Sequence, residues 1–395
     1  MANVSSSNGL EKRPKLRFPG FDEPWEICTA EELFQNVTDK NHPDETVLTI
    51  VQGKGTLPRE QAGRNIHYDD ASLSNYKMVQ KGDFIIHLRS FEGGLEMANE
   101  NGIVSPAYTI LRGKKPHSSR FYEAYFHTDE FVNHVLSKSV EGIRDGRQIS
   151  YDAFKWLGLP YCSPSEQAKI AELFSVLTKR IEKQTVLVDS LKKYKRGLHK
   201  LVFIKNRKPS WEKSALHDIA SFCGGGTPSK DVSSYWDGEI GWISSSDIQE
   251  EWIDDISVTR RITKKAIDNS ATKLCPEGTI AIVSRVGVGK VAIIPESLCT
   301  SQDFTNITSI TGNTHYMAYQ IAFRMKLEAM KTQGTSIKGV TADTIKSMVL
   351  DIPPLEEQKK IADMLTAFDS YIKRAVYELN LFLTMKKALL QQLFI

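Results

Sequence analysis

The stretch Glu166-Gln167-Ala168-Lys169-Ile170-Ala171 returns near the other end of the chain as Glu357-Gln358-Lys359-Lys360-Ile361-Ala362. The offset is 191 residues, from position 166 to position 357, and it holds without gaps from residues 148–204 to residues 339–395. A register kept over so long a segment indicates an internal duplication, and a duplication has to be recognised before the rest of the fold is interpreted.

A second set of matches lies upstream at an offset of 196 residues, from position 89 to position 285. The matched pairs are Gly82 with Gly278, Arg89 with Arg285, Gly93 with Gly289, Ser105 with Ser301, and Tyr108 with Phe304. The chain is therefore predicted to hold two copies of one unit, each a mixed α/β domain followed by a long helix. The predicted segments are a first domain at 1–160, a first helix with its linker at 161–208, a second domain at 209–350 and a second helix at 351–395.

The long helices carry the pattern of a coiled coil. Ser163-Pro164-Ser165-Glu166 is a capping box with proline at the first helical position. Apolar residues then recur at alternating steps of four and three, and the second copy repeats this seam with a lysine, Lys195 or Lys386, at the same position. One such helix alone would also fit a dimerisation coil. Two matching seams in one chain favour antiparallel pairing of the helices within the chain.

Each domain shows both helix and strand patterns. Residues 47–51, 82–88 and 278–283 are apolar runs rich in β-branched side chains, which predicts strands. Residues 118–138 and 314–331 are predicted to be helical, and residues 154–160 and 345–353 to be strand-like. The expected fold class is α+β. Two domains would be separated by two long antiparallel helices that form a coiled coil, with an internal pseudo-twofold repeat.

Composition excludes several classes of protein. The 395 residues include five cysteines, which are scattered and form no C-x-x-C pair, so we expect no disulfide framework or metal site and a cytoplasmic protein. We also expect no membrane span. Residues 164–208 hold 12 Lys and Arg against 4 Asp and Glu, whereas both predicted domains are slightly acidic. The basic excess therefore lies in the first long helix.

The motifs that suggest an enzyme fail on inspection. Gly287-Val288-Gly289-Lys290 loosely fits nucleotide-binding loops, but such loops need a following helix, and the apolar residues 291–294 favour a strand. The segment 351–355, Asp-Ile-Pro-Pro-Leu, lacks the aromatic residue that a similar methyltransferase motif places after its prolines. Since we find no set of acid, base and nucleophile, we predict no catalytic residues and favour a binding protein.

Several stretches together resemble one family. They are the opening residues 17–26 (RFPGFDEPWE), residues 225–228 (GGTP) followed by Tyr235-Trp236 and residues 240–243 (IGWI), residues 352–362 (IPPLEEQKKIA) and the closing residues 386–394 (KKALLQQLF). This set is similar to that of the specificity subunits of type I restriction–modification systems, and the resemblance covers essentially the full length. The first copy of the helix start departs from the pattern, because Pro164 precedes Glu166 by only two residues.

The resemblance implies a non-catalytic subunit that recognises double-stranded DNA. Two target-recognition domains would each read one half of a bipartite site, and the helices would dock two methyltransferase subunits. The implied cofactors belong to partners: S-adenosylmethionine to the methyltransferases, and ATP with Mg to motor-nuclease subunits. The alternative is a coiled-coil adaptor whose globular domains bind proteins, which their acidic charge favours slightly.

The duplication also predicts which residues contact DNA. Residues shared by the two domains should not read different half-sites, so Arg89 and Arg285 are expected either to grip phosphate or to form a structural ion pair. Base-reading residues should lie in divergent loops, where Arg and Lys suit guanine and Gln suits adenine. The candidates are Lys54, Arg59, Gln61 and Arg64 in the first domain, and Lys230, Ser244, Ser245, Ser246 and Gln302 in the second. Any one of them could instead be a solvated loop residue.

Overall fold

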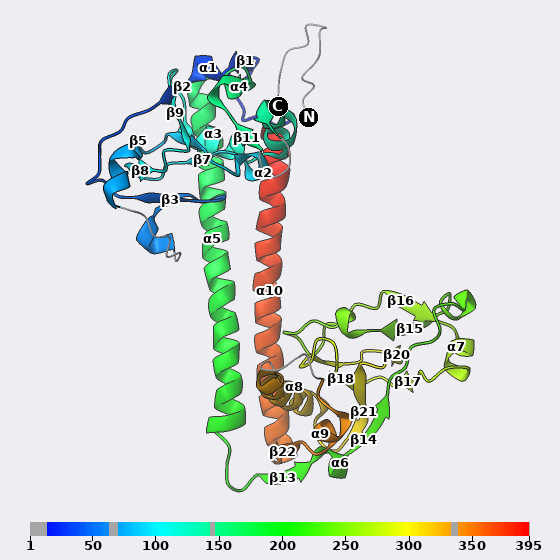
Figure 1. The fold of residues 1–395 in the computed structure, drawn as a ribbon. Coiled ribbons are helices and arrows are strands. Elements are labelled where there is room, and N and C mark those ends of the chain that lie inside the picture. The colour runs from blue at the N-terminus through cyan, green and yellow to red at the C-terminus, as the bar shows by residue number, and fades with distance from the viewer. Residues whose placement is uncertain (1–13, 63–69, 143–146, 333–338, 395) are drawn as a thin grey trace. The chain divides into compact units, whose positions relative to one another are not determined.

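The computed structural model describes residues 14–62, 70–142, 147–332 and 339–394. The chain divides into two compact units. Unit 1 comprises Met1–Thr185 with Tyr377–Ile395, and unit 2 comprises Val186–Val376. The two long helices are α5 (Pro164–Lys200) and α10 (Leu355–Leu393) (Figure 1). Each of them contributes residues to both units. None of the helices in the described ranges is long and apolar enough to cross a membrane.

Unit 1 is built on a four-stranded antiparallel sheet in the order β2-β9-β6-β7. Its strands are β2 (Phe34–Val37), β9 (Thr109–Gly113), β6 (Phe84–Ile86) and β7 (Glu96–Met97). A separate pair, β1 (Glu26–Thr29) with β12 (Gly158–Tyr161), leads into α5, and α1 (Ala30–Leu33) joins β1 to β2. All three residues of β6, a phenylalanine and two isoleucines, are buried, and aromatic and β-branched side chains of this kind favour strands.

A second layer of unit 1 consists of two strand pairs, β4-β3 and β8-β5. These strands are β3 (Leu48–Val51), β4 (Gly55–Pro58), β5 (Lys77–Val79) and β8 (Gly102–Val104). A single parallel bridge from Val47 to Ile103 links the two pairs. The layer therefore has the order β4-β3-β8-β5, with a weak connection at its centre.

Unit 2 repeats both layers. Its first sheet has the order β14-β21-β18-β19, from Ala220–Gly224, Phe304–Ile310, Ile280–Val283 and Val291–Ile293. Its second has the order β16-β15-β20-β17, from Arg260–Ile262, Ile240–Ile243, Leu298–Thr300 and Leu274–Cys275. Here β15 and β20 pair in parallel, as Val47 and Ile103 do in unit 1. Strand β13 (Glu212–Ala215) pairs with β22 (Val349–Ile352) as β1 does with β12.

The remaining elements connect these layers. In unit 1 they are α2 (Ser90–Gly93), α3 (Ser119–Phe126), a π-helix (Glu130–Val135), β10 (Val140–Glu141), β11 (Gln148–Ile149) and α4 (Tyr151–Phe154). In unit 2 they are α6 (Leu216–Ile219), α7 (Lys264–Asp268), α8 (Thr314–Thr332) and α9 (Ala342–Lys346). Short 3-10 helices include Arg59–Ala62, Leu136–Ser139 and Ser245–Asp247.

The helices α5 and α10 pair in antiparallel fashion inside each unit. In unit 1, Phe174 stacks on Phe394, Thr178 bonds Lys386 and Gln184 bonds Glu378, so partner numbers fall on α10 as they rise on α5. In unit 2, Lys195 pairs with Asp369 at 2.7 Å. The seam residues Ile170, Phe174, Leu177, Val188 and Leu191 are buried. The predicted antiparallel coiled coil is therefore confirmed.

The duplicated glutamate at the start of each long helix binds a tryptophan and a cation. In unit 1, Arg17 donates two hydrogen bonds to Glu166, at 2.8 and 2.7 Å, and the indole Nε1 of Trp25 donates a third at 3.1 Å. In unit 2, Lys208 and the Trp211 indole donate to Glu357, at 2.6 and 3.2 Å. The glutamate thus connects the residues near the start of each domain to the long helix that follows that domain in the chain.

The neighbouring glutamine acts in the same way in both units. The amide of Gln167 accepts from the Ser118 backbone N–H and donates to the Cys162 carbonyl, at 2.9 and 2.8 Å. Gln358 accepts from the Asn313 N–H and donates to the Pro353 carbonyl, both at 2.8 Å. Both glutamines are buried, so these backbone groups find the partners that they need out of water.

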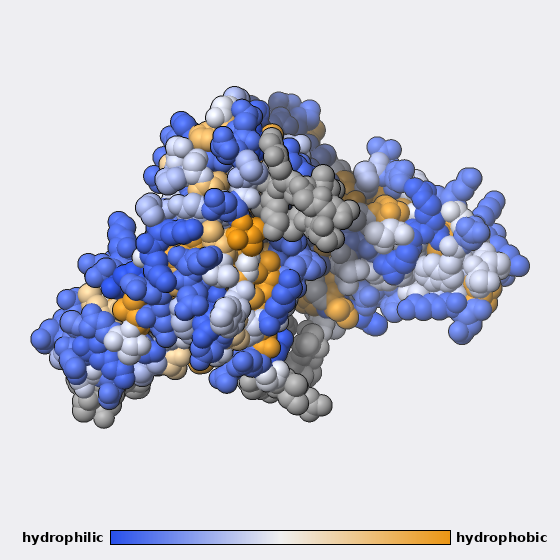
Figure 2. All heavy atoms as spheres, turned by 90° about the horizontal axis from the view of Figure 1, so that it is seen from above, coloured by the Kyte–Doolittle hydropathy of each residue, from blue (hydrophilic) through white to orange (hydrophobic). Residues whose placement is uncertain are grey.

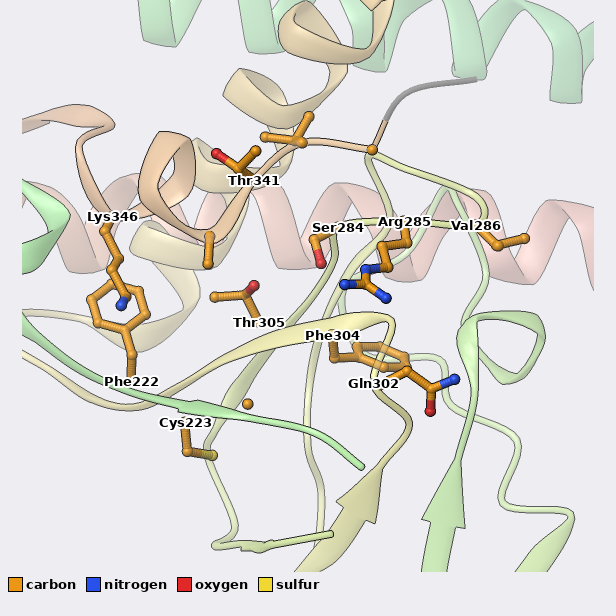
Figure 3. A pocket seen from close by; sticks show the side chains of 14 residues that line it. Phe222, Cys223, Ser284, Arg285, Val286, Gln302, Phe304, Thr305, Thr341 and Lys346 are labelled. Atoms are coloured by element: carbon orange, nitrogen blue, oxygen red, sulfur yellow. The ribbon is translucent and has the colours of Figure 1, made fainter. Parts of the chain in front are cut away.

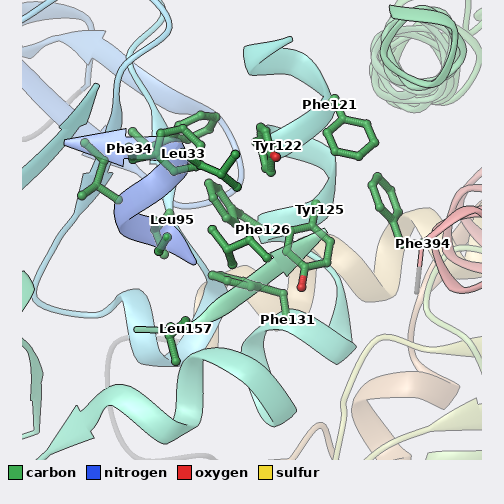
Figure 4. Close-up of a cluster of buried hydrophobic side chains, with 14 of the residues drawn as sticks. Leu33, Phe34, Leu95, Phe121, Tyr122, Tyr125, Phe126, Phe131, Leu157 and Phe394 are labelled. Carbon is green, nitrogen blue, oxygen red and sulfur yellow. The ribbon is translucent and has the colours of Figure 1, made fainter. Parts of the chain in front are cut away.

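Each unit is completed by the end of a long helix that starts in the other. Phe394, after α10, packs against Phe121 and Tyr125 in unit 1, with ring centroids 5.2 and 5.5 Å apart (Figure 4). Phe203, after α5, packs against Tyr316 and Phe323 in unit 2 at 5.9 and 5.6 Å. The two phenylalanines are equivalent in the repeat.

Three sequence predictions differ from the structure in their details. The strand expected at 345–353 begins only at Val349, because α9 extends to Lys346. The helix expected at 118–138 ends at Phe126 and continues as π and 3-10 segments, because Thr128 caps the break by donating to the Tyr125 carbonyl and accepting from the Phe131 N–H. The strand expected at 154–160 begins only at Gly158, since Ser150 caps a helical turn, α4, before it.

We expect Phe394→Ala to destabilise unit 1 by about 3–5 kcal/mol, because it leaves a cavity among buried aromatic rings. Hydrogen exchange followed by mass spectrometry would measure this in α3, with unit 2 as an internal reference. The control is Leu381→Ala on the same helix, where the side chain is exposed. Equal protection of α3 in the two variants would contradict the role of Phe394.

Candidate nucleic-acid interface

The predicted base-reading residues follow equivalent strands in the two units. Lys54 lies in the tight turn between β3 and β4, where its side chain is exposed. Ser244, Ser245 and Ser246 directly follow β15, in the longer connection from residue 244 to residue 259. Because β3 and β15 occupy the same place in the second layer, the structure brings these differently sized segments to equivalent positions.

The turn of unit 1 is held by a buried carboxylate on the neighbouring strand β7. Glu96 accepts hydrogen bonds from the backbone N–H groups of Gly53 and Gly55, at 2.6 and 2.8 Å. The side chain of Asn99 donates to the Lys54 carbonyl at 2.7 Å. Gly53 and Gly55 both have positive φ, at 73° and 77°, which glycine adopts without strain. Lys54 is therefore presented by a fixed backbone.

A histidine pairs with this carboxylate. His127 Nε2 lies 3.2 Å from Glu96. Burial acts to lower the pKa of His127, but the bond to Glu96 outweighs it and leaves that pKa above its ordinary value. Burial acts to raise the pKa of Glu96, but His127 and the two turn amides bring it below its ordinary value. Each group thus favours the charged form of the other.

In unit 2 the corresponding segment, residues 244–259, is held by a cation where unit 1 uses a carboxylate. Lys290, beside β19, donates to the carbonyl of Ser245 at 2.9 Å. Ser244 accepts from Arg260 at 2.6 Å, and its backbone N–H donates to Asp247 at 2.7 Å. Ser244 and the buried Ser245 thus have structural partners, and the exposed Ser246 hydroxyl lies 2.9 Å from that of Ser244. Strands β7 and β19 are equivalent. In both units, therefore, the residue that holds this segment lies on or beside the same strand of the first sheet.

Two further predicted residues of unit 2 line one cleft of about 650 Å³ (Figure 3). Arg285 is exposed at its rim, and Gln302 accepts a hydrogen bond from Thr227. Lys346, from α9, adds a second cation and lies over the Phe222 ring at 5.9 Å. The described residues of its lining include no carboxylate. Two cations with no carboxylate among the described lining residues suit an anion such as phosphate.

Sequence reasoning missed Lys346 and Ser284 in this cleft. Ser284 directly precedes Arg285, so adjacency to a candidate could have found it. Lys346 lies far in sequence from Arg285 and Gln302, and no local pattern distinguishes it from other surface lysines.

The other candidates lie outside this cleft. Arg89 forms an ion pair with Glu92 at 2.6 Å, but both side chains are exposed, and such surface pairs contribute little to stability. Arg59 begins a 3-10 helix after β4, in which Gln61 is exposed, and Lys230 is exposed between β14 and β15. Arg64 lies outside the described residues.

The rejected nucleotide-binding motif is a β-hairpin. Residues 287–290 join β18 to β19, with positive φ at Gly287 and Gly289. Because a strand follows, the turn presents no helix N-terminus to a phosphate. Among the described residues, no group of three or more His, Cys, Asp or Glu side chains could hold a metal ion.

Comparisons with known proteins agree on one family. Residues 209–379 match the family described as the type I restriction modification DNA specificity domain. Over 167 residues the chain is 34% identical to the type I restriction enzyme MjaIX specificity subunit of Methanocaldococcus jannaschii, covering 41% of this chain and 39% of that protein. Over 256 residues it is 28% identical to the EcoR124I/EcoR124II specificity subunit of Escherichia coli, covering 61% and 62%. The matches thus span less than two thirds of either relative's length.

Solved structures share the fold over nearly the whole chain. The S subunit of a type I restriction–modification system from M. genitalium superposes with a TM-score of 0.61 at 14% identity, covering 97% of this chain and 99% of that one. A chain from a structure on the assembly and conformational transition of the type I R-M system gives 0.56 at 14% identity, covering 95% and 98%. At these identities the likeness concerns the fold alone.

Glu96→Gln should lower the stability of unit 1 by about 2 kcal/mol, the typical value for hydrogen bonds to a charged group. The lowered pKa of Glu96 contributes stability that is lost as pH falls below about 4.5. The raised pKa of His127 contributes stability that is present below about 6.5 and lost as pH rises through its folded value.

The difference between wild type and variant should therefore be largest between about pH 4.5 and 6.5. Thermal unfolding across pH would measure it. The control is Glu100→Gln, an exposed glutamate in the connection after β7. A difference that did not vary with pH would contradict the role of the charged pair.

Proposed function

Because the chain belongs to the specificity subunits of type I restriction–modification systems, we propose that each of its units reads one half of a bipartite DNA site. A specificity subunit is the non-catalytic recognition component, so the chemistry belongs to other subunits. On this proposal those partners are two methyltransferase subunits, with motor-nuclease subunits in a complete system.

The observation that carries this proposal is a common scaffold with different loops. Both units have the same two sheet orders, the same glutamate and glutamine contacts, and an equivalent terminal phenylalanine. The segments after β3 and β15 differ in length and sequence at equivalent positions. A protein that reads two different half-sites needs this combination, since shared contacts carry no sequence information.

Within unit 2, the cations of the cleft would hold the DNA backbone. Arg285 and Lys346 would contact phosphate, and Gln302, Lys230 and Ser244–Ser246 would lie close to base edges. In unit 1, Arg89 would contact phosphate, and Lys54, Arg59, Gln61 and Arg64 would belong to the reading loops. Positioning of the turns by Glu96 and Lys290 supports this assignment, because fixed loops lose less entropy on binding.

The long helices offer surfaces for the methyltransferase subunits. The surface in Figure 2 is mainly hydrophilic, with scattered hydrophobic areas. On the helices, however, many apolar side chains are exposed, namely Val176, Tyr377, Leu381, Leu383 and Met385 in unit 1, and Val186, Leu187, Tyr194, Met364 and Tyr371 in unit 2. Exposed apolar side chains gathered on one kind of element are typical of protein interfaces. We assign this surface to the methyltransferase partners.

Replacing residues 1–150 with the same segment of a relative should change one half-site and leave the other intact. Sequencing of methylated DNA from cells that carry the hybrid would report both halves together. The reciprocal hybrid, with residues 209–350 exchanged, is the matched control. A change in both half-sites after one exchange would contradict the assignment of one reader to each unit.

Arg285→Ala and Lys346→Ala should each weaken DNA binding equally for all sequences and reduce the slope of log affinity against log salt by about 1. Gln302→Ala should instead relax specificity at one position, by about 1–3 kcal/mol. Titrations of duplex DNA with the assembled methyltransferase would measure both. Lys213→Ala, an exposed lysine on β13, is the control. An unchanged salt slope in both cleft variants would exclude phosphate contacts there.

A further inference from the structure

Two thiols of unit 2 face each other between its sheets. Cys223 lies on β14 of the first sheet, and Cys275 lies on β17 of the second. Their sulfur atoms are 3.6 Å apart, and both cysteines are free. A disulfide requires about 2.05 Å between sulfurs, so only a small approach separates the present pair from a covalent link.

The two thiols differ in their access to solvent. Cys223 is half-buried and lines the cleft that also holds Arg285 and Gln302 (Figure 3). Cys275 is fully buried. A dissolved reagent that enters the cleft therefore meets Cys223 first and Cys275 only through it.

The contact between the thiols also favours reaction at Cys223. The hydrogen bond between the two sulfurs lowers the pKa of Cys223 to about 6, and the same bond together with burial raises the pKa of Cys275. Since the thiolate is the reactive form of cysteine, Cys223 is poised as the nucleophile at neutral pH. Cys275 keeps its proton and is placed to react as the second thiol once Cys223 has been oxidised.

We propose that Cys223 and Cys275 are an oxidation-sensitive pair, in which a two-electron oxidant such as hydrogen peroxide entering the cleft leads to a disulfide between the two sheets of unit 2. In the first step the Cys223 thiolate attacks one peroxide oxygen, the O–O bond breaks, and hydroxide leaves. The sulfur becomes a sulfenic acid, and the peroxide is reduced. In the second step the Cys275 sulfur attacks that sulfenic sulfur, the S–O bond breaks, and the hydroxyl leaves with the Cys275 proton as water.

The surroundings of Cys223 allow the required approach. The ladder between β14 and β21 shifts register between Ser221 and Phe222, and Cys223 is followed by three glycines, at positions 224–226. Strand β14 is therefore irregular just before the cysteine and ends one residue after it, at Gly224. The same glycine segment leads to Thr227, which bonds Gln302, so the disulfide would fix one wall of the cleft.

The third cysteine of unit 2 is a natural control. Cys299 on β20 is fully buried in a cluster with Trp242, Ile262 and Ala266, whereas Cys275 belongs to a different cluster. Burial raises the pKa of Cys299 to about 11. It should therefore react neither with peroxide nor with Cys223.

The experiment treats the full chain with hydrogen peroxide, alkylates the remaining thiols and identifies peptides by mass spectrometry. The expected result is loss of the Cys223 and Cys275 thiols together, about tenfold faster than that of Cys299, with a linked peptide pair that lacks two hydrogens. Cys275→Ser should stop the reaction at a sulfenic acid on Cys223, which a cyclic dione traps. Cys299→Ser should leave the disulfide unchanged.

Two results would overturn the proposal. One is oxidation of Cys223 at the same rate as Cys299, and the other is a sulfenic acid on wild-type Cys223 that accumulates without a disulfide. Because neither readout involves DNA, both are independent of the proposed function.

A final experiment rests on the proposed function and is evaluated separately from the oxidation itself. Duplex DNA that carries the recognised sequence should protect Cys223 from peroxide if the cleft holds DNA. Disulfide formation without such protection would keep the thiol pair and reject the cleft as a DNA site.

Discussion

The carboxylate in the first turn of each long helix is the contact on which the other features of the fold depend. Glu166 and Glu357 each accept from a tryptophan indole and from a cation near the entry of the unit. A buried or half-buried carboxylate is stable only with such partners, so the glutamate fixes where the unit begins relative to where its helix begins. The adjacent glutamine then joins the long helix to the residue before an earlier helix of the same unit, α3 or α8.

With its entry and exit fixed in this way, each unit can vary its loops without altering its framework. The strand pairing of the second layer also differs between the units. A single bridge in unit 1 stands where a ladder joins β15 to β20 in unit 2. The side chain that holds the equivalent loop even has the opposite charge in the two units. It is the carboxylate of Glu96 in unit 1 and the ammonium of Lys290 in unit 2. What the units share is the position of the loop, and what differs is the chemistry that it presents.

The seam of the paired helices combines apolar packing with polar contacts that differ between the two units. Lys195 in unit 2 reaches the buried Asp369, which also accepts from the Tyr319 hydroxyl at 2.9 Å. Its repeat counterpart Lys386 reaches Thr178 in unit 1, at the position equivalent to Asp369. Burial lowers the pKa of both lysines and raises the pKa of Asp369. The ion pair between Lys195 and Asp369, which has no charged counterpart at Lys386 and Thr178, distinguishes the two helices, which apolar packing alone does not.

The sequence by itself determined the duplication, the two helices and their antiparallel pairing, because each of these follows from spacing: a repeat offset, a heptad and a capping box. The resemblance to a family rested instead on particular motifs, such as residues 352–362. The sequence also found Arg285 and Gln302 as candidates by comparing the two copies. Only the tertiary structure decided that both line one cleft with Lys346, that Glu96 holds the turn of Lys54, and that Cys223 meets Cys275. These residues come from separate strands, turns and helices whose arrangement depends on the packing of a whole unit, and local patterns carry no record of which side chains that packing brings together.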